Sequence, residues 1–132
     1  SGRPLTAICS ARREDVLMSV DMFEDLGAEV ICVTDDAGTS TPEALRPVID
    51  DLVAAGRVDA MFTCGSSRLL RLCQQVAADH GLPGQVALEQ QMACGIGMCQ
   101  CCVRSFRKPE GIVQLRVCAE GPVFDMAEAM GA

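Results

Sequence analysis

Apolar residues in the first two thirds of the chain follow two alternating patterns. Short aliphatic or β-branched runs alternate with longer segments in which apolar residues recur every three or four positions. The runs predict strands at 5–9, 29–34, 58–63 and 85–88. The longer segments predict helices at 14–26, 42–55 and 68–80. Because strands separated by helices need crossover connections, the chain is expected to be α/β with a parallel sheet.

Polar residues and glycines mark the ends of the predicted helices. Thr41 is expected to cap the second helix, with Pro42 at its first position. Ser67 is expected to cap the third helix. Glycine is expected to end the three helices, at Gly27, Gly56 and Gly81.

The pattern changes after residue 86, where we expect a domain boundary that divides the chain into 1–86 and 87–132. A cysteine-rich loop comes first, followed by two alternating runs, 103–106 and 112–117. These runs predict a hairpin across a turn at 108–111, which contains proline and glycine. Residues 125–130 are expected to form a short final helix.

Four cysteines in this second part have the spacing of an iron–sulfur site. Cys94, Cys99 and Cys102 form a Cys-x4-Cys-x2-Cys motif, and Cys118 follows from a separate segment. Three thiolates on a tight loop and one from elsewhere is the arrangement that holds a plant-type [2Fe–2S] cluster. The sequence therefore predicts these four residues as metal ligands.

Two glycines and a further cysteine complete the loop. Gly95 and Gly97 permit positive φ and close approach of the backbone to the cluster. Such a loop also directs backbone N–H groups inward, where they can tune a cluster. Cys101 adjoins Cys102, but only one of the two can have the x2 spacing from Cys99, so we interpret Cys101 as a bystander.

The cysteines have three alternative interpretations: a zinc site, disulfides and a thiol enzyme. Structural zinc sites usually contain two Cys-x2-Cys pairs, and here only one such pair is present. Nine cysteines are an odd number, no signal peptide opens the chain, and three of them are crowded together, which argues against a disulfide framework. A thiol enzyme would need Cys64 near His80, the only histidine, although a predicted helix separates them.

Composition and charge restrict the function further. The net charge of −7 argues against nucleic acid as a partner, since phosphate binding needs a basic face. No apolar run approaches the roughly 18 residues of a membrane span. Many cysteines without a secretion signal indicate a reducing compartment, so we expect a cytoplasmic protein that does not bind membranes. Four cationic residues lie between Cys94 and Cys118 against one acidic residue, and could tune a cluster or dock an acidic partner.

Evidence for nucleotide binding is slight. Ligands of parallel sheets bind at the carboxyl ends of the strands, which here carry residues 10–13, 34–40 and 64–67. Arg12 or Arg13 could meet a nucleotide phosphate, and Asp35 or Asp36 could accept hydrogen bonds from ribose hydroxyls. The chain nevertheless has neither a Gly-x-Gly-x-x-Gly motif after a first strand nor a phosphate-binding Gly-x4-Gly-Lys loop.

The residues around the cysteines resemble a known family. Residues 88–99 (LEQQMACGIGMC) and 116–125 (RVCAEGPVFD) look like the electron-transfer subunit of the NAD-linked dihydroorotate dehydrogenases. Residues 58–65 resemble the last strand and Cys-Gly turn of the ferredoxin-reductase NAD module. Residues 7–17 resemble its second strand and following helix.

The resemblance implies a fold and a function. Residues 1–86 would be a partial ferredoxin-reductase-type NAD module, and residues 87–132 a small β-hairpin domain carrying a [2Fe–2S] cluster. The chain would transfer electrons between a flavin/NAD(P)H module and a flavin-containing catalytic partner in pyrimidine biosynthesis, as a component of an oxidoreductase and not a catalyst on its own. FAD and NAD are implied as cofactors, with Cys64 and Gly65 on the nicotinamide side. The alternative is a zinc-bound or metal-free interaction module.

The resemblance also implies missing parts. The family's flavin-binding barrel and the glycine-rich first strand of its NAD module, where FAD and NAD are mainly bound, have no counterpart in this sequence. That strand is central in the family, so its absence would leave a gap in the sheet. The chain could be a fragment, a partner could fill the gap, or the sheet could be rearranged.

Overall fold

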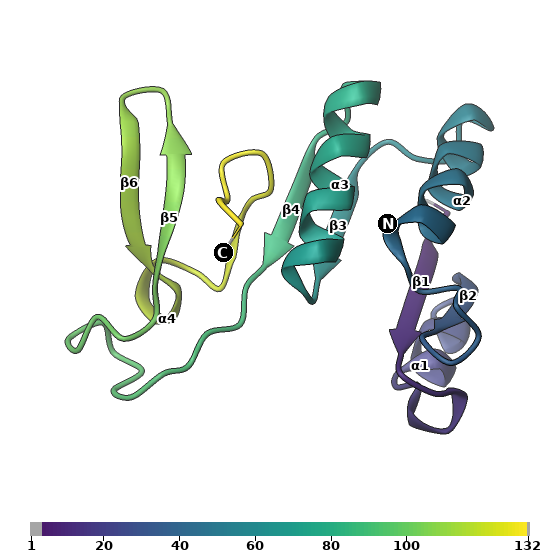
Figure 1. Cartoon of the computed structure of the whole chain (residues 1–132), viewed down its shortest axis with the longest axis horizontal. Helices are drawn as coiled ribbons and strands as arrows, with labels where there is room; N and C mark the ends of the chain where they lie inside the picture. The colour runs from purple at the N-terminus through teal and green to yellow at the C-terminus, as the bar shows by residue number, and fades with distance from the viewer. Residues whose placement is uncertain (1–3, 132) are drawn as a thin grey trace. The chain divides into compact units, whose positions relative to one another are not determined.

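The computed structural model describes residues 4–131, whose strands form three small sheets (Figure 1). Strands β1 (Thr6–Ala11) and β2 (Glu29–Thr34) pair in parallel. Strands β3 (Met61–Cys64) and β4 (Gly84–Ala87) also pair in parallel, and β7 (Val123–Asp125) joins β4 antiparallel. Strands β5 (Val103–Lys108) and β6 (Gly111–Arg116) form an antiparallel hairpin. The helices are α1 (Val20–Asp25), α2 (Pro42–Ala54), α3 (Ser67–His80) and α4 (Val117–Glu120).

The expected α/β class and its parallel strand pairs are confirmed, but the strands do not form one sheet. Residues 4–57 and 58–131 are two compact units, and β1–β2 belongs to the first while β3–β4–β7 belongs to the second. The predicted domain boundary between residues 86 and 87 stays a prediction. Strands β4 and β7 pair with each other within the second unit.

The first unit is built around the β1–β2 pair. The β-branched run of β2 begins and ends where the pattern predicts, and it buries Val33. Thr41 caps α2 as expected, since its hydroxyl accepts a hydrogen bond from the amide of Ala44 at 3.2 Å. Leu45 and Ile49, four residues apart on α2, are the buried residues of that helix.

The first predicted helix is wrong in its extent. Residues 14–26 contain only a single 3₁₀ turn, Glu14–Val16, and the short helix α1. Ser19, immediately before α1, has a left-handed backbone with φ of +64°, and its side chain does not cap the helix. Regular helical hydrogen bonding cannot pass through a left-handed residue, and this divides the segment in two.

In the second unit, α3 packs on β3. Its buried residues are Leu70, Leu72, Val76 and Ala77. The cap of this helix is Ser66, one residue before the expected Ser67, and its hydroxyl accepts from the amide of Leu69 at 3.4 Å. Gly81 ends the helix in the left-handed conformation, as the sequence predicts.

The segment 123–130 joins the α/β part of the second unit to the hairpin. Its first residues form β7 beside β4, and farther on Arg107 of β5 donates its backbone N–H to the carbonyl of Glu128 at 2.8 Å. The amide of Met130 donates in turn to the carbonyl of Ser105 at 3.0 Å. In Figure 1 this yellow segment lies between β4 and the hairpin. The predicted helix at 125–130 is wrong, because these backbone groups bond to neighbouring elements instead of to one another.

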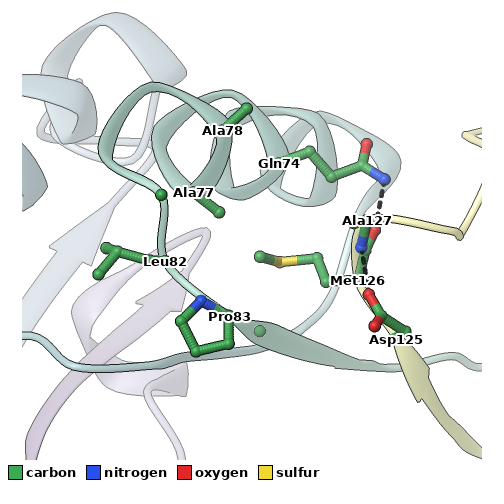
Figure 2. Close-up of a pocket in the computed structure, with 10 residues that line it drawn as sticks. Gln74, Ala77, Ala78, Leu82, Pro83, Asp125, Met126 and Ala127 are labelled. Carbon is green, nitrogen blue, oxygen red and sulfur yellow. Dashed lines mark hydrogen bonds between the residues drawn. The ribbon is translucent and has the colours of Figure 1, made fainter.

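Helix α3 also binds this segment through Gln74. Its side-chain amide donates to the carbonyls of Met126 and Ala129, at 2.7 and 2.6 Å. Gln74 and Met126 line a hollow of about 240 Å³. Figure 2 shows the side chain of Gln74 directed at the backbone next to Ala127, and the side chain of Met126 pointing into the hollow. Met126 is 1% exposed, so its side chain is packed in the core and the hollow lies at the edge of that core.

Two phenylalanines form the centre of the hairpin's packing. The rings of Phe106 on β5 and Phe124 on β7 are 4.4 Å apart between centroids and tilted by 36°. Phe106 is fully buried. In the part of the chain that the structure describes, no helix is long and apolar enough to cross a membrane.

Candidate metal centre

The cysteine-rich loop turns sharply, with three residues of positive φ. Gly95 and Gly97 have φ of +69° and +81°, which confirms the positive φ expected at these glycines. Gln100 has φ of +57°, which the sequence did not predict. The loop begins after β4, and its last cysteine leads directly into β5.

The first two predicted ligands lie together on this loop. The Sγ atom of Cys94 accepts a hydrogen bond from the backbone N–H of Cys99 at 3.4 Å. The pKa of Cys94 is lowered to about 6, mainly by this bond. Further hydrogen bonds come from the backbone of Ile96 and Met98 and from the side chain of Cys99. The loop thus directs several N–H groups at one sulfur, and so favours its thiolate form.

The other two predicted ligands form a second pair. The Sγ atoms of Cys102 and Cys118 are 3.2 Å apart. Cys102, at the end of the loop, is 2% exposed, and Cys118 lies in α4 immediately after the hairpin. The N–H of Cys118 donates to the Sγ of Cys102 at 3.4 Å, and this bond is the main reason that the pKa of Cys102 is lowered.

Gly97 connects the loop to Cys118. The pKa of Cys118 is raised, mainly because its thiol shares a hydrogen bond with Cys102 and is partly desolvated. A hydrogen bond from the backbone of Gly97 acts in the opposite direction. The tip of the loop therefore contacts the sulfur that comes from the distant segment.

The arrangement is two pairs of thiols. Among residues 4–131, no three metal-binding side chains converge closely enough to hold a single ion. A binuclear iron–sulfur cluster has a different requirement, because its four thiolates divide between two irons. The donor set and its pairing therefore fit a [2Fe–2S] group.

The hairpin supplies the geometry of the second pair. Strands β5 and β6 pair from Val103↔Arg116 to Lys108↔Gly111, with a two-residue turn between them. Because Cys102 precedes β5 and Cys118 follows β6, the closed hairpin places these cysteines side by side. Cys101 is exposed and lies outside both pairs, in the position of the bystander that the spacing indicates.

The cationic residues near the loop are mostly engaged. Lys108 pairs with Glu128 at 2.5 Å, and Arg104 donates to the carbonyl of Met130 at 3.1 Å. Arg116 is bound to Glu120 and to the carbonyl of Gly97. Arg116 is thus the one of the four that the described hydrogen bonds connect to the loop, a role that spacing alone did not reveal.

The residues predicted on the nicotinamide side lie at the end of β3. Cys64 is its last residue and is exposed, and Gly65 follows with φ of +150°. His80 is the last residue of α3, which is 14 residues long, so it lies about 20 Å along the helix from Cys64. A catalytic Cys64–His80 pair is therefore ruled out by geometry.

The polar residues at the ends of β1 and β2 make local contacts. Asp35 accepts a hydrogen bond from the hydroxyl of Ser40, which is buried. Arg13 forms a two-point ion pair with Asp15, at 2.7 and 2.9 Å. Two of the groups considered for ribose and phosphate therefore have protein partners here.

The rates at which Cys73 and Cys64 are alkylated test the burial of Cys73 in the second unit. Burial raises the pKa of Cys73 on α3, and a hydrogen bond with Thr63 only partly offsets this. A raised pKa means less thiolate at neutral pH, and therefore slower alkylation. In the native protein treated with iodoacetamide, we expect Cys73 to react much more slowly than the exposed Cys64. Peptide mass spectrometry at successive times measures both rates, and equal rates would contradict the burial of Cys73.

Comparison with known proteins identifies the class of the cysteine-rich segment. Residues 89–129 match the family described as the iron–sulfur cluster binding domain of dihydroorotate dehydrogenase B. This part of the chain is therefore similar to an iron–sulfur cluster binding domain.

Two curated relatives are similar to this chain over about nine tenths of its length. The chain is 34% identical over 119 residues to the electron transfer subunit of dihydroorotate dehydrogenase B (NAD(+)) of Caldanaerobacter subterraneus subsp. tengcongensis, covering 90% of this chain and 46% of that protein. It is 33% identical over 124 residues to a probable subunit of the same kind from Methanocaldococcus jannaschii, covering 93% and 45%. The resemblance found in the sequence is confirmed. The chain spans less than half the length of these curated relatives.

A solved structure agrees. A chain from the structure of an NADH-dependent reduced ferredoxin–NADP oxidoreductase, described in connection with flavin-based electron bifurcation, matches 98% of this chain and 45% of its own length. The TM-score is 0.75 and the sequence identity is 25%. The α/β architecture is therefore shared with a ferredoxin–NADP oxidoreductase-type protein.

Proposed function

We propose that the chain transfers single electrons through a [2Fe–2S] cluster held by Cys94, Cys99, Cys102 and Cys118. The observation that carries the proposal is the division of these four thiols into two pairs, which matches the two irons of such a cluster. When bound, the cluster supplies one-electron oxidation and reduction. The similarity of residues 89–129 to an iron–sulfur cluster binding domain supports the same assignment.

The protein's own residues would hold and tune the cluster. The backbone N–H groups directed at Cys94 and Cys102 reduce the negative charge on those sulfurs, which favours electron uptake. Thiolates are soft ligands, which bind iron–sulfur clusters more readily than they bind hard metal ions such as Mg²⁺. Residues 87–132 would thus be the cluster-binding domain.

The partners are also part of the proposal. The relatives are electron transfer subunits of a dihydroorotate dehydrogenase, so we infer a flavin-containing catalytic subunit on one side and a flavin/NAD(P)H module, with FAD and NAD, on the other. Cys64 and Gly65 would lie on the nicotinamide side. Ile96 and Met98, on the loop beside the thiols, are 70% and 78% exposed. Exposed apolar side chains next to the electron-carrying site suit a partner's surface.

The first experiment measures what the full chain binds. After anaerobic purification we expect about two irons and two acid-labile sulfides per chain, and after reduction with dithionite an EPR signal of a reduced binuclear centre. Stoichiometric zinc without iron, or no metal after attempted reconstitution, would refute electron transfer and favour an interaction module. Oxidation of the reduced protein by a dihydroorotate dehydrogenase-type flavin subunit, followed by stopped-flow absorbance, tests the partner separately.

A further inference from the structure

Arg116 connects the two segments that carry the thiols. It is the last residue of β6, immediately before α4. One end of its guanidinium donates from Nη1 to the carbonyl oxygen of Gly97 at 2.9 Å. The rest of it binds the carboxylate of Glu120, with Nε at 3.0 and 3.1 Å from the two oxygens. The side chain therefore spans from the cysteine loop to the end of α4.

Glu120 binds both the side chain and the backbone of Arg116. One of its oxygens also accepts the backbone N–H of Arg116 at 2.5 Å. The two residues are four positions apart and bracket Cys118, which lies midway between them in the sequence. A planar guanidinium can bind a carboxylate with two N–H groups while a third remains for another acceptor, which a lysine ammonium does less well.

Gly97 is the point at which the loop contacts this pair. A Cβ atom at Gly97 would lie 3.0 Å from the Cβ of Ala119 and 3.3 Å from Nη1 of Arg116. The peptide of Gly97 is thus in close contact with the segment on either side of Cys118. Its N–H bonds to Cys118 and its carbonyl to Arg116, so both polar groups of one residue are held.

We propose that Arg116 is a positioning residue that fastens the loop of Cys94 and Cys99 against the segment bearing Cys118. Glu120 orients its guanidinium and balances its charge beside the cluster. The inference rests on the proposed [2Fe–2S] function and goes beyond it, since Arg116 and Glu120 are not ligands. The same guanidinium has two separable effects, one on how firmly the cluster is retained and one on its reduction potential.

The charge effect has a definite sign. The cluster becomes more negative on reduction, so a nearby positive charge stabilises the reduced form and raises the potential. Arg116→Gln removes the cation and is expected to shift the potential to more negative values. Glu120→Gln leaves the cation unbalanced and is expected to shift the potential to more positive values.

The retention effect depends on the hydrogen bond to Gly97. Arg116→Gln and Arg116→Lys both disturb it, and we expect iron release to a chelator to become about tenfold faster or more, the size typical of changes around a metal ligand. Arg116→Lys retains the charge, so its potential should stay near that of the wild type. Arg107→Gln, an exposed arginine on β5 of the same hairpin, is the matched control for loss of one positive charge.

The experiment uses the full chain with its cluster assembled anaerobically. Midpoint potentials are measured by optically monitored redox titration, and retention by the rate at which bathophenanthroline extracts iron. Opposite potential shifts in R116Q and E120Q, together with faster release in R116K at an unchanged potential, would establish the proposal. Iron release from R116Q and R116K at the wild-type rate would overturn it.

Failure of the proposed function and failure of the role of Arg116 give different results in this experiment. If the wild-type chain assembles no cluster, the proposed function fails together with the inference. If the wild type and all variants assemble clusters that differ in neither release rate nor potential, only the role of Arg116 fails. Should the Arg116 variants lose their folded circular dichroism spectrum, E120Q decides the question, because Glu120 orients the guanidinium of Arg116. Faster iron release from E120Q than from the wild type would support the proposal, and release at the wild-type rate would overturn it.

Discussion

Serine in place of Cys118 is expected to leave the protein without its iron–sulfur cluster, and serine in place of Cys102 is expected to do the same. The Sγ atoms of these cysteines are 3.2 Å apart, so both would bind the same iron. A serine hydroxyl is a harder ligand than a thiolate and is not ionised at neutral pH, so iron would lose a strong ligand. Iron analysis and the visible absorption of anaerobically purified protein measure the loss, which should be nearly complete.

Cys101→Ser is the matched control for this prediction. Cys101 adjoins Cys102 in the chain but is exposed, whereas Cys102 is 2% exposed. The C101S protein should therefore contain as much iron as the wild type. The opposite result, with iron retained by C102S and lost by C101S, would show that the neighbouring cysteine is the ligand and that the loop is arranged differently.

Alanine in place of Phe106 is expected to destabilise the second unit by about 3–5 kcal/mol, the usual effect of removing a buried aromatic ring. Phe106 is fully buried, and its ring packs against Phe124. The loss would loosen β5 from the segment 123–130 and so disturb the site of Cys102. Urea unfolding followed by far-UV circular dichroism measures the effect, and cluster retention provides a second readout.

The control for Phe106 is Phe62 on β3. Phe62 is 74% exposed, so alanine there should change the free energy of unfolding by no more than about 0.5 kcal/mol. If the two compact units unfold in separate transitions, only that of residues 58–131 should move in F106A. Equal effects at Phe62 and Phe106 would contradict the packing described for the hairpin.

The sequence predicted those elements whose cause is local. Strand β2 has the predicted bounds because β-branched residues occupy four of its six positions. Helix α2 begins at the predicted threonine cap and proline, and the hairpin closes around the predicted turn. In each case the residues that decide the structure lie within the element or immediately beside it.

The errors occur where distant contacts decide the structure. Residues 125–130 have the periodicity of a helix, but Gln74 and β5 bind their backbone groups, and residues 126–128 form a turn. The thiol pairs show the same limit. The spacing of the cysteines predicted the four ligands, but the pairing of Cys102 with Cys118 depends on closure of the hairpin. The contact of Arg116 with Gly97 likewise joins residues 19 positions apart in the sequence.

The position of segment 123–130 has a consequence for biosynthesis. This segment follows all four predicted ligands in the chain, yet it bonds to β4, α3 and β5 and completes their packing. On the ribosome, the cysteines therefore emerge before the scaffold that holds them can close. Iron delivered at that stage would meet a mobile, incomplete set of thiols. Stable insertion of the centre should accordingly follow the packing of residues 123–130 against β4, α3 and β5.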